Sequence, residues 1–394
     1  MLRAFESTEL VHIPYQRHSG TAKEDIITRE SFASAIAEIT AWDGYAATPL
    51  HHLKALATKL NLGDILYKDE GPRFGLGSFK ALGGAYAAAK VLQHELSRKI
   101  GNQVDLADIR NGRYVSLAKE ITLVSATDGN HGRSLAWGAQ RFGAACNIYI
   151  HEAVSEGRAE AMRHLGANVI RIDGDYDASV HLARKEAEIN GWFVVSDTSW
   201  EGYRDPPLDV MAGYGVMTDE IAQQMESPPT HVFLQGGVGG LAASVCSALR
   251  QHWGQVAPRV IIVEPNHAAC LFESAQSDEM KSVHIFEETI MAGLSCGEPS
   301  PIAWEILREE TSDFIKISDD IVAPAMRLLA KPLGNDPSIE GGESAVAGLA
   351  AALVIAINPK LRNYFDFDET SKILLIGSES ATDRALYEQV MTQN

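Results

Sequence analysis

The sequence predicts an α/β fold in which mostly parallel β-sheets are covered by helices on both faces. Short, largely apolar runs alternate with helical stretches, and strands are expected at 65–70, 121–124, 147–150, 168–172, 192–196, 231–234, 260–263 and 373–376. Parallel strands are usually buried on both faces, so they lack the apolar–polar alternation of half-exposed strands. A succession of such strands and helices indicates the α/β class.

The size and charge of the chain restrict its function. Its 394 residues suffice for two domains or one large α/β unit. The chain has 34 Lys and Arg against 52 Asp and Glu, and the resulting formal charge of −18 argues against nucleic acid or an anionic membrane as a partner. The apolar run at 345–357 is too short to span a membrane and is expected to be a buried helix. Residues 1–6 contain no apolar segment of a secretory signal, so we expect a cytoplasmic protein.

The cysteines and histidines do not indicate a metal site. The cysteines show no CxxC spacing and lie at Cys146, Cys246, Cys270 and Cys296. Reduced thiols are expected, and a bridge between the last two stays open. His51 and His52 are expected to lie together on a helix surface, because no His, Cys or Asp cluster has metal-ligand spacing.

The N-terminal part shows weaker signals. Residues 12–15 indicate a turn and residues 31–39 a helix. A turn at 47–50 leads into a second helix, and the strand at 65–70 then delivers the chain to a glycine-rich loop. Residues 91–120 are expected to be an elaboration that precedes the regular strands.

One lysine occupies a glycine-flanked turn that runs into an alanine-rich helix. Lys80 lies in Gly75-Leu76-Gly77-Ser78-Phe79-Lys80-Ala81-Leu82-Gly83-Gly84. Small neighbours let a flat ligand approach the amine, and a lysine amine forms a Schiff base readily when its pKa is lowered by burial or by nearby cations. Taken alone, the motif fits a solvated surface lysine better. Two other stretches reverse that balance.

The first of these stretches is a glycine loop between a strand and a helix. Its residues are Gly236, Gly237, Val238, Gly239 and Gly240. Glycines let backbone N–H groups approach an anion, and a helix N-terminus favours negative charge, so a phosphate site is expected rather than only a tight turn. The glycine spacing is not GxGxxG, which argues against a nicotinamide dehydrogenase, and the lysine of a P-loop is also absent.

The second stretch is a polar loop that follows a strand and opens a helix. It reads Ser125-Ala126-Thr127-Asp128-Gly129-Asn130-His131-Gly132. Open α/β sheets bind ligands at the carboxyl ends of their strands. A helix cap at Asp128 or Asn130 explains one polar residue. A ligand site explains the four polar residues of the loop together better than a helix cap does.

Together, the three stretches resemble those of the fold type II pyridoxal-phosphate (PLP) enzymes, the family of the tryptophan synthase β-subunit. The resemblance covers roughly residues 45–385. It implies two open, twisted, mostly parallel sheets flanked by helices, with PLP as the cofactor in a cleft between two domains. The implied large domain is formed by 1–87 and 176–394, and the implied small domain by 88–175.

Within this family, the chain is most similar to the ammonia-lyases that act on 2,3-diaminopropionate. Serine and threonine dehydratases of this fold mostly have a hydroxyl residue where this chain has Asp128. Two further markers are Arg73-Phe74-Gly75-Leu76-Gly77-Ser78-Phe79-Lys80 and Ser196-Asp197-Thr198-Ser199-Trp200-Glu201-Gly202-Tyr203. The implied reaction eliminates ammonia from both the D and the L isomer and gives pyruvate and two ammonia molecules.

The resemblance assigns catalytic roles to three residues. Lys80 would carry the cofactor and act as the base on the L isomer, and Asp128 would act as the base on the D isomer. A carboxylate at position 128 would repel a substrate carboxylate but attract a β-ammonium. Asp197 would assist or bind that β-ammonium.

Other residues are expected to bind the cofactor. Phe79 and Asn130 would lie at the PLP ring, the glycine loop would bind its phosphate, and Ser378 would hydrogen-bond the pyridine nitrogen. Ser380 is the alternative to Ser378. Glu343 is expected mainly to pair with the N-terminus of the buried helix that follows it.

Two alternatives stay open. One is a serine or threonine dehydratase of the same fold, and the other is a non-catalytic sensor of an amino acid or phosphate. The expected partners are a small amino-acid substrate and, from the resemblance, a second copy of the chain in a homodimer.

Overall fold

The computed structural model describes residues 2–15, 23–127 and 129–392, and these form two compact units with one sheet each. The first unit comprises Met1–Arg29, Ala47–Ser78 and Met217–Asn394, and the second comprises Glu30–Ala46 and Phe79–Val216. The second unit extends beyond 88–175 because a strand and a helix after residue 175 pack into its sheet.

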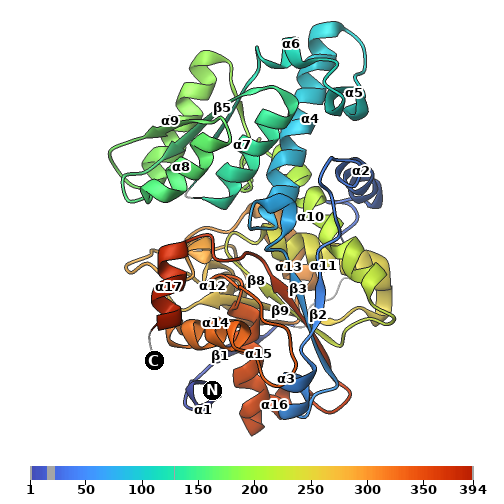
Figure 1. Cartoon of the computed structure of the whole chain (residues 1–394), viewed down its shortest axis with the longest axis vertical. Helices are drawn as coiled ribbons and strands as arrows, with labels where there is room; N and C mark the ends of the chain where they lie inside the picture. The colour runs from blue at the N-terminus through green and yellow to red at the C-terminus, as the bar shows by residue number, and fades with distance from the viewer. Residues whose placement is uncertain (1, 16–22, 128, 393–394) are drawn as a thin grey trace. The chain divides into compact units, whose positions relative to one another are not determined.

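The first unit contains a seven-stranded sheet in the order β1-β10-β9-β8-β11-β3-β2 (Figure 1). The five inner strands are parallel, and the edge strands β1 and β2 run antiparallel to their neighbours. The bounds are β1 Val11–Pro14, β2 Leu50–His52, β3 Asp64–Asp69, β8 His231–Gln235, β9 Arg259–Pro265, β10 Asp313–Ile317 and β11 Lys372–Gly377. This sheet confirms the predicted mostly parallel architecture.

Two local predictions in this sheet are wrong. The turn expected at 12–15 is largely strand β1, which tolerates Pro14 because an edge strand can leave one side of its backbone unpaired. His51 and His52 lie on β2 and not on a helix, and they pair with Asp69 and Asp64 of the neighbouring strand.

Helices cover both faces of the seven-stranded sheet. The apolar α15 packs on β8, β9, β10 and β11, and α14 packs on α15. On the opposite face α11 packs on β8 and α13, and Trp304 of α13 contacts Phe314 of β10 with ring centroids 6.2 Å apart. The helices of this unit are α1 Arg3–Glu6, α3 Lys54–Lys59, α11 Gly240–Trp253, α12 Cys270–Ser277, α13 Pro301–Glu310, α14 Val322–Ala330, α15 Ala347–Ile357, α16 Pro359–Tyr364 and α17 Arg384–Thr392.

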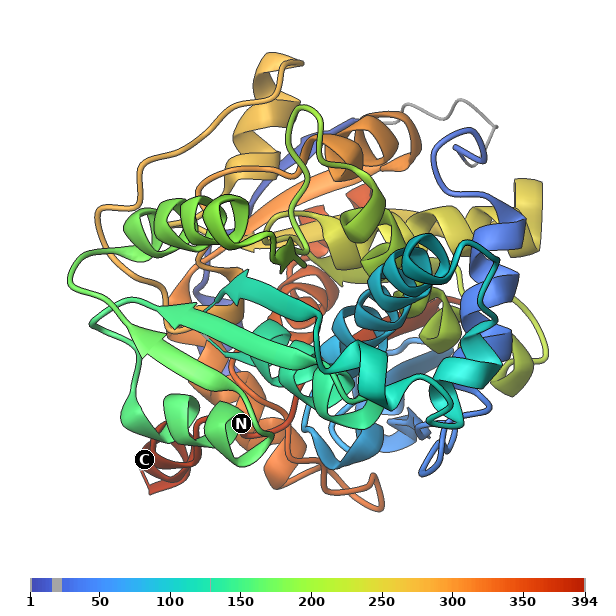
Figure 2. The same cartoon turned by 90° about the horizontal axis from the view of Figure 1, so that it is seen from above.

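The second unit contains a four-stranded parallel sheet in the order β6-β5-β4-β7. Figure 2 shows helix α9 on one face of this sheet and helices α7 and α8 on the other. The strands are β4 Thr122–Ala126, β5 Ala145–Ile150, β6 Asn168–Arg171 and β7 Phe193–Val194. The helices are α2 Arg29–Ile39, α4 Lys80–Ile100, α5 Leu106–Arg110, α6 Val115–Ala118, α7 Asn130–Phe142, α8 Glu156–His164, α9 Tyr176–Asn190 and α10 Asp205–Gln224. The first residue of α2 and the C-terminal part of α10, from Met217 on, belong to the first unit.

The described residues contain no membrane-spanning helix, disulfide or metal cluster. Within 2–15, 23–127 and 129–392, none of the helices has the length and apolar character that a bilayer crossing requires. All four cysteines are free thiols, so Cys270 and Cys296 are not bridged. The same described residues contain no group of three His, Cys, Asp or Glu side chains that could hold a metal ion.

Candidate active site

Lys80 is the first residue of α4 and follows a tightly held turn. A short 3₁₀ helix, η1 (Arg73–Gly75), contains Phe74 with φ +50°, a left-handed conformation that is strained for a bulky residue. The turn is fixed on its far side because the Ser380 N–H donates to the Gly77 carbonyl over 2.9 Å. The amine is therefore carried on a rigid helix end that a defined turn precedes.

In the second unit, Lys80 forms an ion pair with Asp197. The Lys80 ammonium donates to Oδ2 of Asp197, and both side chains are mostly buried. Burial alone would raise the pKa of Asp197, but the charge and the hydrogen bond of the Lys80 ammonium outweigh it and hold this pKa well below its usual range. Asp197 is therefore an ionised carboxylate beside the lysine that the sequence motif singles out.

His131 lies next to this pair as a neutral imidazole. Its Nε2 donates to the Val195 carbonyl over 2.9 Å, which leaves Nδ1 unprotonated. Nδ1 is 4.0 Å from Oδ2 of Asp197 and has no hydrogen-bond partner among the described residues. Burial is the main reason why the pKa of His131 is lowered. The sequence motif that contains His131 indicates no separate role for this residue.

The polar loop is placed only in part. Asp128 lies outside the described residues. Gly129 precedes α7, and Asn130 is the first residue of that helix, after the carboxyl end of β4. Phe79 packs against Tyr214 with ring centroids 4.7 Å apart, and the Lys80 Nζ lies 5.6 Å from the Phe79 ring centroid. The structure thus brings Phe79, Lys80 and Asp197 together.

The loop that carries Asp197 is closed by its own residues. Trp200 and Tyr203 exchange two backbone hydrogen bonds of 3.2 and 3.0 Å, and their rings stack 3.8 Å apart. The Tyr203 hydroxyl donates to the Val194 carbonyl and accepts from the Ser196 N–H, both over 2.9 Å. The loop is therefore fixed immediately before Asp197.

In the first unit, the glycine loop follows β8 and opens α11. Gly237 and Gly239 have φ of +59° and +96°, which a side chain would oppose. A Cβ at Gly236 would lie 2.4 Å from Cγ of Glu264, and one at Gly239 would lie 2.9 Å from Cβ of Ala303. Because the first N–H groups of a helix lack intrahelical partners, α11 presents N–H donors where these glycines leave room. This geometry fits a phosphate group.

Glu264 forms one wall behind the glycine loop. Its carboxyl group accepts from the backbone N–H groups of Leu271 and Phe272 at 3.0 and 2.7 Å. Burial raises the pKa of Glu264 to about 8, although these two N–H groups oppose the shift. The side chain is held in place, so it cannot easily make room for a larger residue at position 236.

This contact makes Gly236→Ala a local test of the loop. The new methyl group would overlap the fixed Glu264 side chain, and we expect a loss of about 1–3 kcal/mol of stability together with weaker PLP binding. Thermal unfolding and PLP titration of the apoprotein measure the two effects. Gly157→Ala on α8 is the control, because a Cβ there meets nothing within 4 Å. Unchanged PLP affinity in Gly236→Ala would contradict a phosphate site here.

Ser378 lies in the first unit directly after β11. It is buried, with 5% of its surface exposed. Ser380, the alternative to Ser378, ties down the lysine turn through the Gly77 carbonyl. Glu343 is also buried and lies in the turns that precede α15, the helix whose N-terminus it was expected to pair with.

A buried ion cluster in the first unit was not predicted from the sequence. Arg73 donates to the carboxylates of Glu70 and Glu220, and Lys68 donates to Glu220, at distances of 2.7–2.8 Å. The Thr48 hydroxyl donates to Glu70 over 2.6 Å. All four charged side chains are at most 3% exposed. The only sequence signal was the unusual run of charged residues at the end of an otherwise apolar strand.

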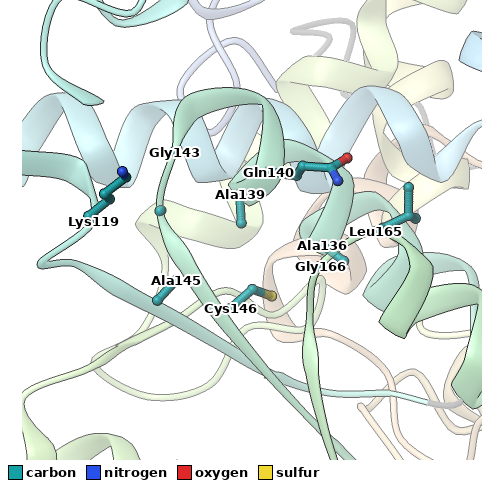
Figure 3. A pocket seen from close by; sticks show the side chains of 10 residues that line it. Lys119, Ala136, Ala139, Gln140, Gly143, Ala145, Cys146, Leu165 and Gly166 are labelled. Carbon is teal, nitrogen blue, oxygen red and sulfur yellow. The ribbon is translucent and has the colours of Figure 1, made fainter. Parts of the chain in front are cut away.

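One cavity of about 310 Å³ in the second unit contains none of the predicted site residues (Figure 3). It lies at the start of β5 and the ends of α7 and α8, where Gln140, Cys146 and Gly166 line it. The polar loop follows the opposite, carboxyl end of the parallel strands. We therefore do not assign this cavity to the active site.

Comparisons with known proteins show the family of the chain. The family description "Pyridoxal-phosphate dependent enzyme" matches residues 41–375. Diaminopropionate ammonia-lyase from Escherichia coli K12 is 39% identical over 354 residues, which cover 88% of each chain. The chain belongs to the diaminopropionate ammonia-lyase family of pyridoxal-phosphate dependent enzymes.

Solved structures of the E. coli family member have the same fold. Its complex with an aminoacrylate–PLP azomethine reaction intermediate is 36% identical, with a TM-score of 0.88 and coverage of 98% of this chain and 97% of that one. Its complex with D-serine is 35% identical, with a TM-score of 0.89 and the same coverage. These matches confirm the predicted fold type II architecture and PLP as the cofactor.

Proposed function

We infer that the chain is a carbon–nitrogen lyase that uses PLP to eliminate ammonia from 2,3-diaminopropionate, giving pyruvate and two ammonia molecules. The observation that carries this inference is the pairing of Lys80 with Asp197 in a chain of this family. A coupled pyruvate assay with 2,3-diaminopropionate, together with the visible spectrum of the purified protein, tests it. A colourless protein that forms no pyruvate would favour the sensor alternative.

We propose that the Lys80 amine would hold the PLP cofactor through its aldehyde, and that the N–H groups of residues 236–240 would bind a phosphate group. Ser378 would be a hydrogen-bond partner for the pyridine nitrogen, and Asn130 and Phe79 would be contacts for the ring. When bound, PLP supplies an aldehyde that captures amines and a ring that accepts electrons from the substrate Cα. A hydroxyl group at Ser378 cannot protonate the pyridine nitrogen as a carboxyl group can, which makes the ring a milder electron acceptor and favours elimination.

Asp197 is expected to bind the β-ammonium group of the substrate. Its carboxylate is compensated by the Lys80 ammonium. This mostly buried carboxylate would attract a second ammonium group, brought by a substrate, for the same reason that it attracts the Lys80 ammonium. Diaminopropionate brings this second ammonium group and serine does not. This difference supports diaminopropionate as the better substrate.

The two isomers require bases on opposite faces of Cα. We propose that Lys80 removes the Cα proton of the L isomer and Asp128 that of the D isomer. Asp128→Asn should therefore lower kcat for the D isomer by about 10²–10⁴-fold, because a positioned base contributes that much. Turnover of the L isomer should stay within about tenfold of wild type. Steady-state kinetics with each isomer decide, and an equal loss for both would exclude the two-base assignment.

A dehydratase activity is the nearest alternative. A probable D-serine dehydratase from Shouchella clausii is 24% identical and covers 80% of this chain, and the E. coli family member was crystallised with D-serine. A panel of D- and L-serine, threonine and both diaminopropionate isomers separates the two functions. A higher kcat/KM for serine than for diaminopropionate would favour the dehydratase.

We also propose that the enzyme is a cytoplasmic homodimer. The family resemblance supports the dimer, and the free thiols are compatible with a reducing compartment. Light scattering of the purified holoenzyme measures the oligomeric state, and fractionation of the producing cells measures the location.

A further inference from the structure

The loop between β7 and α10 carries Asp197 and depends on one tyrosine. Strand β7 has only two residues, Phe193 and Val194, so the sheet itself holds little of the chain that follows. Tyr203 compensates, because its hydroxyl donates to the Val194 carbonyl and accepts from the Ser196 N–H. One hydroxyl group thus joins the end of the strand to the residue before Asp197.

The ring of Tyr203 is fixed as firmly as its hydroxyl. It stacks on Trp200 with an interplanar angle of 8° and a centroid distance of 3.8 Å. On Trp200 lies the guanidinium group of Arg184, with its central carbon 3.7 Å from the ring centroid. Aromatic stacking and a cation over an indole ring both stabilise such an arrangement. Arg184 belongs to α9, so the stack attaches the loop to a helix of the second unit.

The hydroxyl group stays protonated. Burial raises the pKa of Tyr203 well above its usual value. A protonated hydroxyl is required for donation to Val194 while it accepts from Ser196. The hydroxyl group is hydrogen-bonded to the backbone of Val194 and Ser196, so its effect on the position of Asp197 passes through the backbone of the loop.

We propose that Tyr203, held by Trp200 and Arg184, is a positioning residue that places the Asp197 carboxylate against the Lys80 amine. The proposal rests on the function proposed above for Asp197. Displacement of a catalytic group by a fraction of an ångström to 1 Å lowers turnover measurably. The hydroxyl group of Tyr203 should therefore affect catalysis without touching the substrate.

Tyr203→Phe tests the proposal, because it removes the hydroxyl and keeps the stacked ring. We expect kcat for diaminopropionate to fall by about 10- to 100-fold. Since a nearby carboxylate favours the protonated form of a cationic nitrogen, the pH midpoint of the visible absorbance of the bound cofactor should shift downward, in the same direction as in Asp197→Asn. The double variant should be no slower than Asp197→Asn alone, because Tyr203 acts through Asp197.

Tyr86→Phe is the matched control. It removes another buried tyrosine hydroxyl of the second unit, which donates to Ser34 over 3.3 Å, and it should leave both kcat and the absorbance midpoint at wild-type values. Arg184→Met is the second variant, for the case in which Tyr203→Phe does not fold. It leaves the loop sequence unchanged and should shift the midpoint in the same direction.

The outcomes separate this proposal from the proposed function. A wild-type kcat and midpoint in Tyr203→Phe, or additive losses in the double variant, would overturn the positioning role and leave the role of Asp197 intact. A wild-type kcat in Asp197→Asn would instead overturn the proposed function of Asp197, and the positioning role with it. If only Arg184→Met can be measured, an unshifted midpoint overturns the proposal.

Discussion

Replacement of Lys80 by alanine should lower kcat for 2,3-diaminopropionate by about 10⁴-fold or more. The substitution removes both the amine that we propose carries the cofactor and the proposed base for the substrate Cα, and a positioned base alone contributes about 10²–10⁴-fold. The visible absorbance of the lysine-bound cofactor should disappear as well. Pyruvate formation and the absorption spectrum of the purified variant measure the two effects.

The control for this variant is on the same helix. Lys99 also belongs to α4, but its amine pairs with Glu120 at the surface. Lys99→Ala should keep wild-type turnover and spectrum, because exposed ion pairs contribute little. Equal activities of the Lys80 and Lys99 variants would show that another group performs the chemistry assigned to Lys80.

The second large effect is expected on stability. Arg73→Met should destabilise the folded chain by about 3–5 kcal/mol, because it leaves Glu70 and Glu220 buried with less compensating charge. Urea unfolding measures the free-energy change. Arg384→Met is the control, since Arg384 is 61% exposed and pairs with Glu340 on the surface; its cost should stay below about 1 kcal/mol. Similar costs for both variants would contradict the buried cluster.

The cluster also implies a pH dependence. Burial alone would raise the pKa of Glu220, but hydrogen bonds and charge from Arg73 and Lys68 outweigh it and lower this pKa below its usual value of 4.5. A lowered pKa means that the ionised carboxylate contributes stability above about pH 4.5 and that this contribution is lost as the pH falls through the folded-state pKa. The free energy of unfolding should therefore fall with acidification below pH 4.5, and less steeply in Glu220→Gln.

Much of the fold could be predicted because its signals are local. The expected strand at 373–376 corresponds to β11, Lys372–Gly377, and the expected buried helix at 345–357 corresponds to α15, Ala347–Ile357. Strand β10, Asp313–Ile317, escaped prediction because polar residues interrupt its apolar pattern. Strand β1 escaped because its proline indicates a turn unless the edge position of the strand is known.

The candidate site could be predicted only where a motif carries it. Lys80 and the glycine loop stand in contiguous sequence patterns, so the sequence indicates their chemistry. The pairing of Lys80 with Asp197 joins residues 117 positions apart, and no local pattern contains it. The neutral state of His131 and the bridging hydroxyl of Tyr203 depend on burial and on backbone partners that only the folded chain supplies.

Borohydride reduction of the holoenzyme, followed by peptide mass spectrometry, tests the central claim most directly. Reduction fixes the cofactor to the amine that carries it, so the account predicts a pyridoxyl group on Nζ of Lys80. An adduct on any other lysine, or a coloured and active enzyme that yields no adduct at Lys80, would contradict it.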